Sequence, residues 1–251
     1  MTIELSLVEP SLLWLPGAMG SFADEDALTR FAALPRRGFL RIGLPGGNSL
    51  EEQIANLEAQ RARFESLGET HLIATLGLMP RWLSAVPQAA GNTPGGVPEY
   101  STHRAANYPV YQELCRRTAA TFQDWGMAHR VTLEHWNEPN TRNFWTDSQA
   151  EYFDHLRMAH AGVRQGSDQI HFAGSAFSGA SSDWIAPMLA YCGSRGVRLD
   201  ALTWHAFLGQ VSDGMEFVEG GKDARVAAGF PRDLPQILTE VGHRIDEVRK
   251  I

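Results

Sequence analysis

The densest group of side chains able to do acid–base chemistry lies in Glu134-His-Trp-Asn-Glu-Pro-Asn140. This segment closes a β-rich apolar stretch, and we expect the strand to end at Pro139, which has no N–H for a ladder. Strand alternation predicts that Glu134, Trp136 and Glu138 share one face. Carboxylates inside a sheet are costly to bury, which favours a chemical role. The alternative is a strand that ends in turn-prone surface residues.

A second carboxylate favours the chemical role. The stretch Gln236–Glu240 is another apolar run that ends in Glu, and Gly242 follows closely. If both strands belong to one closed β-barrel, their carboxylates lie at the same opening of that barrel, and this arrangement suits glycoside hydrolysis. One of them protonates the leaving oxygen, while the other stabilises or attacks the anomeric carbon.

These motifs sit in a regular alternation of short apolar runs with longer stretches of 3.6-residue periodicity. The expected strands are Gly38–Gly43, His71–Leu76, Arg130–Trp136, Ile170–Ser175, Leu199–His205 and Gln236–Glu240. The expected helices are Asp24–Leu34, Leu50–Leu67, Tyr108–Trp125, Ser148–Arg164, Asp183–Arg195 and Asp223–Ala228.

Strict alternation predicts parallel strands with helical crossovers, in an open doubly wound sheet or a (β/α)8 barrel. The Gly43–Gly47 segment lacks both the G-x-G-x-x-G spacing and a P-loop lysine, which argues against a nucleotide site. With 251 residues, the chain fits a TIM-type barrel of about 250 residues. The long Ser84–Tyr108 segment shows almost no periodicity, and we expect it to be a functional loop that decides substrate choice.

We interpret residues 1–251 as a single barrel catalytic domain that lacks its final β/α unit. If the first strand lies near Leu12–Leu15, the stretch ending at Glu240 is the seventh strand, and residues 241–251 are too few for an eighth. The strand of Glu240 would then be an open edge, with low stability and a tendency to associate as consequences. A first strand at Thr2–Leu7 would change this count.

The order of the motifs resembles the clan A glycoside hydrolases, and most closely glycoside hydrolase family 39 (β-xylosidase and α-L-iduronidase-like proteins and related bacterial proteins). The resemblance spans about Phe39 to Gly242. The motifs that carry it are Leu76-Gly-Leu-Met-Pro-Arg-Trp82, Trp136-Asn-Glu-Pro-Asn140, Phe144-Trp145 before Glu151-Tyr152, Leu199-Asp-Ala-Leu-Thr-Trp-His205, and Thr239-Glu240.

The resemblance implies a retaining mechanism, with Glu138 as the general acid/base and Glu240 as the nucleophile. It implies that Asn137 hydrogen-bonds the sugar 2-hydroxyl, an interaction that strengthens in the transition state. Arg41 resembles the basic residue that keeps the nucleophile ionised, and an ordinary salt bridge to Glu134 is the alternative.

His205 resembles the family's histidine that lines the sugar subsite. The family continues His-x-Tyr, whereas this chain has Phe207, which has no hydroxyl to position the nucleophile. Trp82, Trp145 and Trp204 are candidates for stacking on sugar rings; Trp14, Trp125 and Trp184 are expected to fill the core, and core packing remains the alternative for any tryptophan. His135 is either a subsite residue or a packed strand histidine.

Composition and charge argue against several other functions and partners. The chain has 22 basic and 29 acidic residues and a net charge of −7, which argues against nucleic acid as a partner. No run reaches the about 20 apolar residues of a membrane span, and no positive segment precedes Leu12, so a cytoplasmic location is the default unless the true N-terminus lies elsewhere. Cys115 and Cys192 are interpreted as buried thiols. Neither a metal site nor an organic cofactor is implied.

We therefore interpret the chain as an enzyme, a retaining glycosidase acting on β-linked oligo- or polysaccharides. Transfer to an acceptor other than water uses the same covalent intermediate and stays open. The alternative from another class is a catalytically weak or inactive carbohydrate-binding homologue or fragment, which Phe207 favours.

Overall fold

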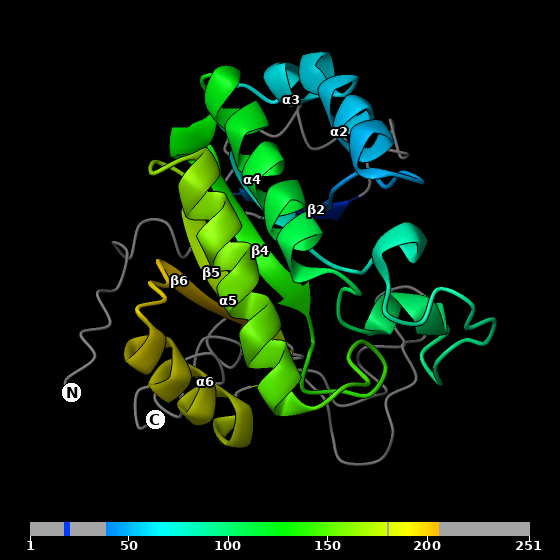
Figure 1. Cartoon of the computed structure of the whole chain (residues 1–251). Coiled ribbons are helices and arrows are strands. Elements are labelled where there is room, and N and C mark those ends of the chain that lie inside the picture. The colour runs from blue at the N-terminus through cyan, green and yellow to red at the C-terminus, as the bar shows by residue number, and fades with distance from the viewer. Residues whose placement is uncertain (1–17, 21–38, 180, 206–251) are drawn as a thin grey trace, which may run out of the picture.

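The computed structural model of this 251-residue chain describes residues 18–20, 39–179 and 181–205 (Figure 1). The strand expected at 236–240 and the helices expected at 24–34 and 223–228 lie outside the described residues, as does the first strand expected at 12–15. A short strand within the described part, at residues 18–20, takes the first position in the sheet.

Six described strands form one parallel sheet, and each strand pairs with the next one along the chain. They are β1 (Ala18–Gly20), β2 (Phe39–Gly43), β3 (His71–Thr75), β4 (Val131–Asn137), β5 (His171–Ser178) and β6 (Ala201–His205). A doubly wound sheet reverses its strand order at a switch point. The unreversed order seen here is that of a barrel wall, so the described strands form a partial TIM-type barrel.

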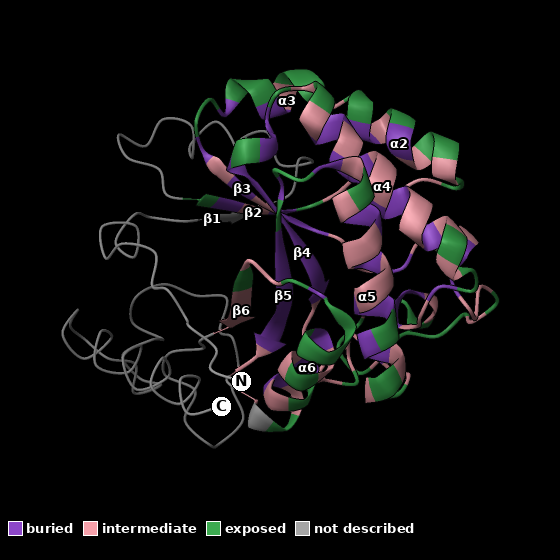
Figure 2. Ribbon diagram, turned by 60° about the vertical axis from the view of Figure 1, so that its left-hand side comes forward, coloured by how far each residue is buried: buried purple, intermediate pink, exposed green. Residues whose placement is uncertain are grey.

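The described α-helices all pack on one face of the sheet and arc around its outside (Figure 2). They are α2 (Leu50–Glu58), α3 (Arg61–Ser66), α4 (Tyr108–Asp124), α5 (Gln149–Gly166) and α6 (Ser182–Arg195). The order of helices and strands from residue 39 to residue 205 is the predicted one. Short 3-10 helices at Arg81–Leu83, Glu99–Thr102 and Ala128–Arg130 lie in the connections.

The two longest helices begin at well-formed caps. Ser148 caps α5 through a capping box, in which its side chain accepts from the N–H of Glu151 and the Glu151 carboxylate accepts from the N–H of Ser148. Asn107 caps α4 by accepting from the N–H of Val110. Each cap satisfies main-chain donors that the first turn leaves unpaired, and so fixes where the helix starts after its loop.

One helix prediction is wrong: the stretch Leu50–Leu67 is two helices. The N–H of Gln60 bonds to the carbonyl of Leu57, three residues back, at 3.0 Å. This bond tightens the backbone at Ala59 and starts a new helix at Arg61. No glycine or proline stands at the break, and the apolar periodicity continues across it. The sequence therefore gives no signal that the helix is interrupted.

The core lies between the sheet and its helices, and its largest buried side chains are aromatic or aliphatic. These include Trp136, Tyr152, Phe64, Phe122, Phe172, Phe177, Leu72 and Leu133. The helices α4 and α5 lie side by side (Figure 1) and approach closely at Gly162 and Gly166. A Cβ at Gly162 would lie only 2.2 Å from the carbonyl oxygen of Gln112 on α4.

Cys115 and Cys192 are buried thiols, as predicted. Burial raises the pKa of each thiol to about 12.

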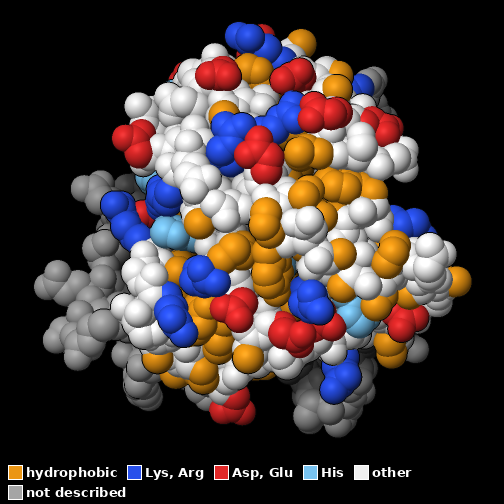
Figure 3. Space-filling model, in the orientation of Figure 1, with side chains coloured by type: hydrophobic (Ala, Val, Ile, Leu, Met, Phe, Trp, Pro, Cys, Tyr) orange, Lys and Arg blue, Asp and Glu red, His pale blue; other side chains and the backbone are white. Residues whose placement is uncertain are grey.

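On the helical face, acidic and basic side chains are interspersed (Figure 3), and they include the ion pair between Arg117 and Glu51 at 2.7 Å. Among the described helices, none combines the length and the apolar character needed to cross a bilayer.

Candidate active site at the carboxyl ends of β4 and β6

The backbone at the end of β4 adopts an unusual conformation. Trp136 has φ of +69° and Glu138 has φ of +43°. Residues other than glycine rarely enter this left-handed region, and such strain collects at functional sites when the surroundings hold it in place. Pro139 follows directly, and β4 spans Val131–Asn137, one residue later at each end than the expected Arg130–Trp136, so that it stops before Pro139.

Hydrogen bonds to β5 hold this strained segment. The N–H of Glu138 donates to the carbonyl of Ala176 at 2.8 Å. The Asn140 amide accepts from the N–H of Ser178 at 2.8 Å and donates to the carbonyl of the same residue at 3.1 Å. Thr141 donates its N–H to the Glu138 carbonyl at 3.0 Å. Asn140 is therefore a positioning residue, because it fixes the loop that carries Glu138.

Glu138 and His205 meet above the end of β5. Oε1 of Glu138 lies 2.6 Å from Nδ1 of His205, and their side chains are 13% and 24% exposed. The register places His205 beside Ser178 of β5, and the N–H of Gly179 donates to the His205 carbonyl at 3.1 Å. A carboxyl group in contact with an imidazole and partly open to solvent is a competent proton donor and acceptor.

A second polar group lies beside this pair, on the inner face of β2 and β4. Nε and Nη2 of Arg41 both lie 2.6 Å from Oε2 of Glu134. Nη2 also donates to Oδ1 of Asn137 at 3.1 Å. Thr75 on β3 donates to the same Glu134 oxygen at 3.4 Å. The salt bridge weighed for Arg41 is thus present, and it extends to Asn137.

Strand alternation fails at Trp136. Its indole packs edge-on against Trp145 and His155, on the helical side of the sheet, and Nε1 donates to the Phe144 carbonyl at 2.7 Å. The positive φ turns this side chain away from the face of Glu134, so the prediction that the two share a face is wrong. The same turn allows Asn137 to reach Arg41.

Two residues expected at the sugar are buried. Trp145 is 2% exposed, and its Nε1 donates to the carbonyl of Ser148. His135 is 0% exposed and packs against α5, as in the packed-histidine alternative. Both side chains belong to the core between sheet and helix, so neither presents a face to a ligand in this structure.

His135 belongs to a buried hydrogen-bonded chain. Its Nδ1 lies 3.0 Å from the hydroxyl of Tyr152, which also bonds to Ser175, and its Nε2 lies 3.0 Å from Nδ1 of His155. Burial lowers the pKa of His135 to about 3. Burial, then the neighbouring His135 and Arg104, hold the pKa of His155 well below 6.5. Both imidazoles are therefore neutral at physiological pH.

The other tryptophan candidates are half-buried near strand ends. Trp82 follows β3, and its Nε1 donates to Oε1 of Gln53 at 3.3 Å. Trp204 lies on β6 directly before His205 and beside Phe177 of β5. Glu240 and Phe207 lie outside the described residues.

The long segment after β3 is joined to the segment between β4 and α5. Oδ2 of Asp147 accepts from the N–H of Arg104 at 2.7 Å, and Oδ1 lies 2.7 Å from Nδ1 of His103. Oδ1 of Asn143 accepts from the N–H of Gly95 at 3.1 Å. The loop expected at Ser84–Tyr108 is therefore a fixed wall next to the loop of Glu138. The sequence carried no sign of these contacts, which join residues more than forty positions apart.

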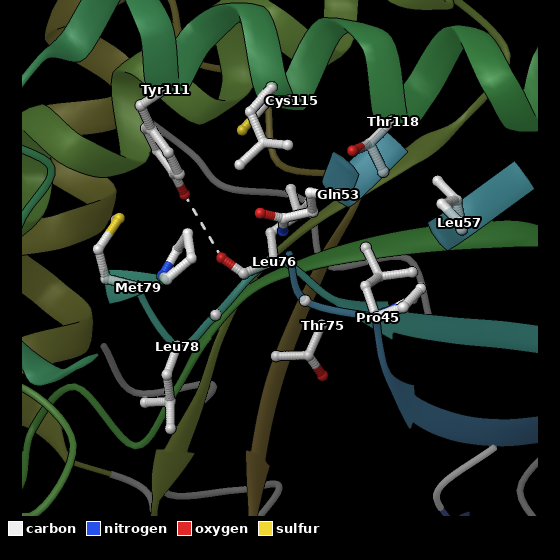
Figure 4. Close-up of a pocket in the computed structure, with 15 residues that line it drawn as sticks. Pro45, Gln53, Leu57, Thr75, Leu76, Leu78, Met79, Tyr111, Cys115 and Thr118 are labelled. Atoms are coloured by element: carbon white, nitrogen blue, oxygen red, sulfur yellow. Dashed lines mark hydrogen bonds between the residues drawn. The ribbon is translucent and has the colours of Figure 1, made fainter. Parts of the chain in front are cut away.

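A cavity of about 150 Å³ lies between α2, α4 and the turn after β3 (Figure 4). Leu57, Tyr111 and Leu114 contribute to a largely apolar lining, and the Tyr111 hydroxyl donates to the carbonyl of Leu76 at 3.4 Å. Neither Glu138 nor His205 lines it, so it is separate from the candidate active site. Among the described residues, no group of three or more His, Cys, Asp or Glu side chains is arranged to hold a metal ion.

Parallel strands in chain order with helices on the outer face define the (β/α)-barrel class of folds, in which functional side chains lie at the carboxyl ends of the strands. The chain belongs to glycosyl hydrolases family 39, whose family model matches residues 90–218. It is 29% identical over 135 residues to a β-xylosidase of Geobacillus stearothermophilus, covering 52% of this chain and 26% of that protein.

Solved structures show the same fold. A monomeric β-xylosidase from Caulobacter crescentus CB15 matches with a TM-score of 0.64 and 15% identity, over 93% of this chain and 49% of that one. A GH39 enzyme from Xanthomonas axonopodis pv. citri matches with a TM-score of 0.58 and 16% identity, over 75% and 40%. This chain thus spans less than half the length of each of these relatives.

Proposed function

We propose that this chain is a retaining glycosidase that cleaves β-glycosidic bonds in an oligo- or polysaccharide, with Glu138 as the acid/base. The observation that carries the proposal is the placement of Glu138. It stands at the carboxyl end of β4 in a held, left-handed backbone, 2.6 Å from His205. Family 39 membership and the β-xylosidase relative support the same chemistry.

In the first step, Glu138 gives its proton to the leaving oxygen as the bond from that oxygen to the anomeric carbon breaks. The Glu240 carboxylate forms a bond to the same carbon and yields a glycosyl ester. In the second step, Glu138 takes a proton from water as the water oxygen attacks the anomeric carbon and releases Glu240. The nucleophile role rests on the sequence resemblance. We expect the two carboxyl groups to lie about 5–5.5 Å apart, as retention requires.

The rest of the site is assigned by the same reasoning. Asn137 donates to the sugar 2-hydroxyl, His205 lines the subsite, and the half-buried Trp82 and Trp204 offer aromatic surface to sugar rings. The fixed wall of the Ser84–Tyr108 segment lies on the side of Glu138, which is the side of the leaving group. We infer that this wall limits which leaving groups enter.

The test is hydrolysis of aryl β-xylosides, β-glucosides and β-galactosides, with retention of configuration followed by NMR. Replacing Glu138→Ala should slow substrates with poor leaving groups by about 10²- to 10⁴-fold and spare dinitrophenyl glycosides in the first step. Azide should then accelerate release of the glycosyl enzyme. Glu240→Gly should abolish turnover of every substrate. The exposed Glu58→Ala serves as the matched control and should match the parent chain.

Inverted products, or equal losses in both variants without an azide effect, would contradict the assignment. A second candidate function is a carbohydrate-binding homologue without turnover. Phe207 favours it, because phenylalanine has no hydroxyl to position the nucleophile. Saturable binding of xylo-oligosaccharides with no product from any of the aryl glycosides would support this second function.

A further inference from the structure

We infer that Glu134 is a positioning residue which, acting through Arg41, fixes the orientation of the Asn137 amide and so makes the site selective for sugars with a hydrogen-bond acceptor at C2. The inference rests on the proposed function. It concerns a carboxylate that takes no part in the two-step mechanism.

Glu134 does not itself reach a substrate. Its side chain is 2% exposed, and that of Arg41 is 15% exposed. A carboxylate buried this far is tolerated when it is paired and hydrogen-bonded. Two nitrogens of the guanidinium and the Thr75 hydroxyl converge on its Oε2. These bonds come from β2 and β3, so they lock the guanidinium in one plane against the sheet.

The locked guanidinium decides which way the Asn137 amide faces. Guanidinium nitrogens only donate hydrogen bonds. The atom of Asn137 that lies 3.1 Å from Nη2 of Arg41 must therefore be the carbonyl oxygen. The amide NH2 group then points away from Arg41, and Asn137 presents donors to whatever lies beside it at the end of β4.

This polarity selects among sugars. A 2-hydroxyl oxygen can accept from the Asn137 NH2, whereas a 2-deoxy sugar leaves that group without a partner. A protonated 2-amino group can only donate, so it meets donors and the nearby charge of Arg41. A site built to hydrogen-bond a substrate hydroxyl strongly rejects analogues that lack it.

Removing the charge of Glu134 should disturb the orientation of Asn137. In Glu134→Gln, the Arg41 guanidinium loses its ion pair, and the Asn137 amide becomes free to rotate. The loss should be confined to substrates that use the 2-hydroxyl. We expect kcat/KM for 4-nitrophenyl β-D-xyloside to fall by about 10- to 100-fold. That for its 2-deoxy analogue should change by less than about 3-fold.

Two further variants keep the inference testable if Glu134→Gln does not fold. Asn137→Ala removes the donor and should lose the same discrimination, with no further loss when it is combined with Glu134→Gln. Arg41→Lys keeps the positive charge but has a single nitrogen in place of the planar guanidinium that bonds both Glu134 and Asn137. It should lose part of the discrimination between the hydroxy and deoxy substrates. Thermal melts identify variants that are merely unstable, and the exposed Glu58→Ala is the matched control.

Equal losses on the hydroxy and deoxy substrates would overturn the inference, as would unchanged discrimination in Glu134→Gln. If the parent chain turns over no glycoside, the proposed function fails by itself. Calorimetric titration with methyl β-D-xyloside and its 2-deoxy analogue then makes the same comparison. Preference for the hydroxy sugar in the parent chain, lost in Glu134→Gln, supports the positioning role, and no preference in either overturns it.

Discussion

Nδ1 of His205 lies 2.6 Å from Oε1 of Glu138, although Glu138 follows β4, His205 ends β6, and β5 lies between these two strands. The contact crosses the carboxyl end of β5. There the Asn140 side chain bonds the loop after β4 to Ser178, and the N–H of Gly179 donates to the carbonyl of His205 at the end of β6. The position of the candidate acid/base therefore depends on three consecutive strands, and disturbing any one of them should be seen in the proton-transfer step.

Replacing His205→Gln should test this contact. We expect kcat on aryl glycosides with poor leaving groups to fall by about 10- to 100-fold, with a smaller loss on dinitrophenyl glycosides, because only the former need a well-placed proton. His129→Gln, at an exposed histidine, is the control and should leave kcat on both kinds of substrate unchanged. An equal loss on all leaving groups would argue that His205 only binds the sugar.

The neutral histidines His135 and His155 should make stability depend on pH. Their pKa values are lowered in the folded chain, to about 3 for His135, from an unfolded value of 6.5. Below pH 6.5 the unfolded chain binds protons that the folded chain excludes, so the free energy of unfolding falls as the pH falls. The expected loss from pH 7 to pH 5 is about 2 kcal/mol for His135, and His155 adds a loss of the same sign.

Urea denaturation at pH 7, 6 and 5 measures this loss. His155→Gln should reduce the slope of stability against pH by roughly the share of one histidine, whereas His129→Gln should leave it unchanged. A parent chain whose unfolding free energy is the same at pH 7 and pH 5 would refute the prediction.

Gly162→Ala should destabilise the chain, which reverses the usual sign of this change in a helix. Alanine normally favours a helix over glycine by about 1 kcal/mol. Here the new Cβ would lie 2.2 Å from the Gln112 carbonyl oxygen and 2.9 Å from Cβ of Cys115, so α4 and α5 must move apart. We expect a net loss of about 1–3 kcal/mol, measured by chemical denaturation.

The control for this change is Gly46→Ala, because a Cβ at Gly46 would meet nothing within 4 Å. It should alter the unfolding free energy by less than about 0.5 kcal/mol. Gly166→Ala should behave like Gly162→Ala, since its Cβ would lie 2.1 Å from the Arg116 carbonyl oxygen. A stabilised Gly162→Ala chain would show that the two helices are less closely packed than described.

Asp147→Ala should loosen the wall formed by the segment after β3. The change removes the acceptor for the N–H of Arg104 and the partner of His103. Because hydrogen bonds to charged groups are worth about 1.5–3 kcal/mol, amide exchange in residues 84–107 should accelerate by at least about tenfold. Exchange in β4 should stay slow. Asp168→Ala, at an exposed aspartate, is the control, and equal protection in both variants would contradict the role of Asp147.

The sequence by itself determined the alternation of strands and helices and the strand that ends at Pro139. These features are local: periodicity reports which side of an element is buried, and proline stops a ladder wherever it stands. The order and spacing of the motifs from Leu76 to Glu240 also indicated the family, although each motif taken alone is a weak sign.

Only the tertiary structure decided how those residues face one another. The left-handed backbone of Trp136 reverses the face that alternation predicts, because bonds to β5 hold a conformation that the local sequence would not choose. Trp145 is buried because α5 packs over it. The pairing of Arg41 with Glu134 joins residues 93 positions apart. Such contacts arise when the strands assemble side by side, so no periodicity in the chain encodes them.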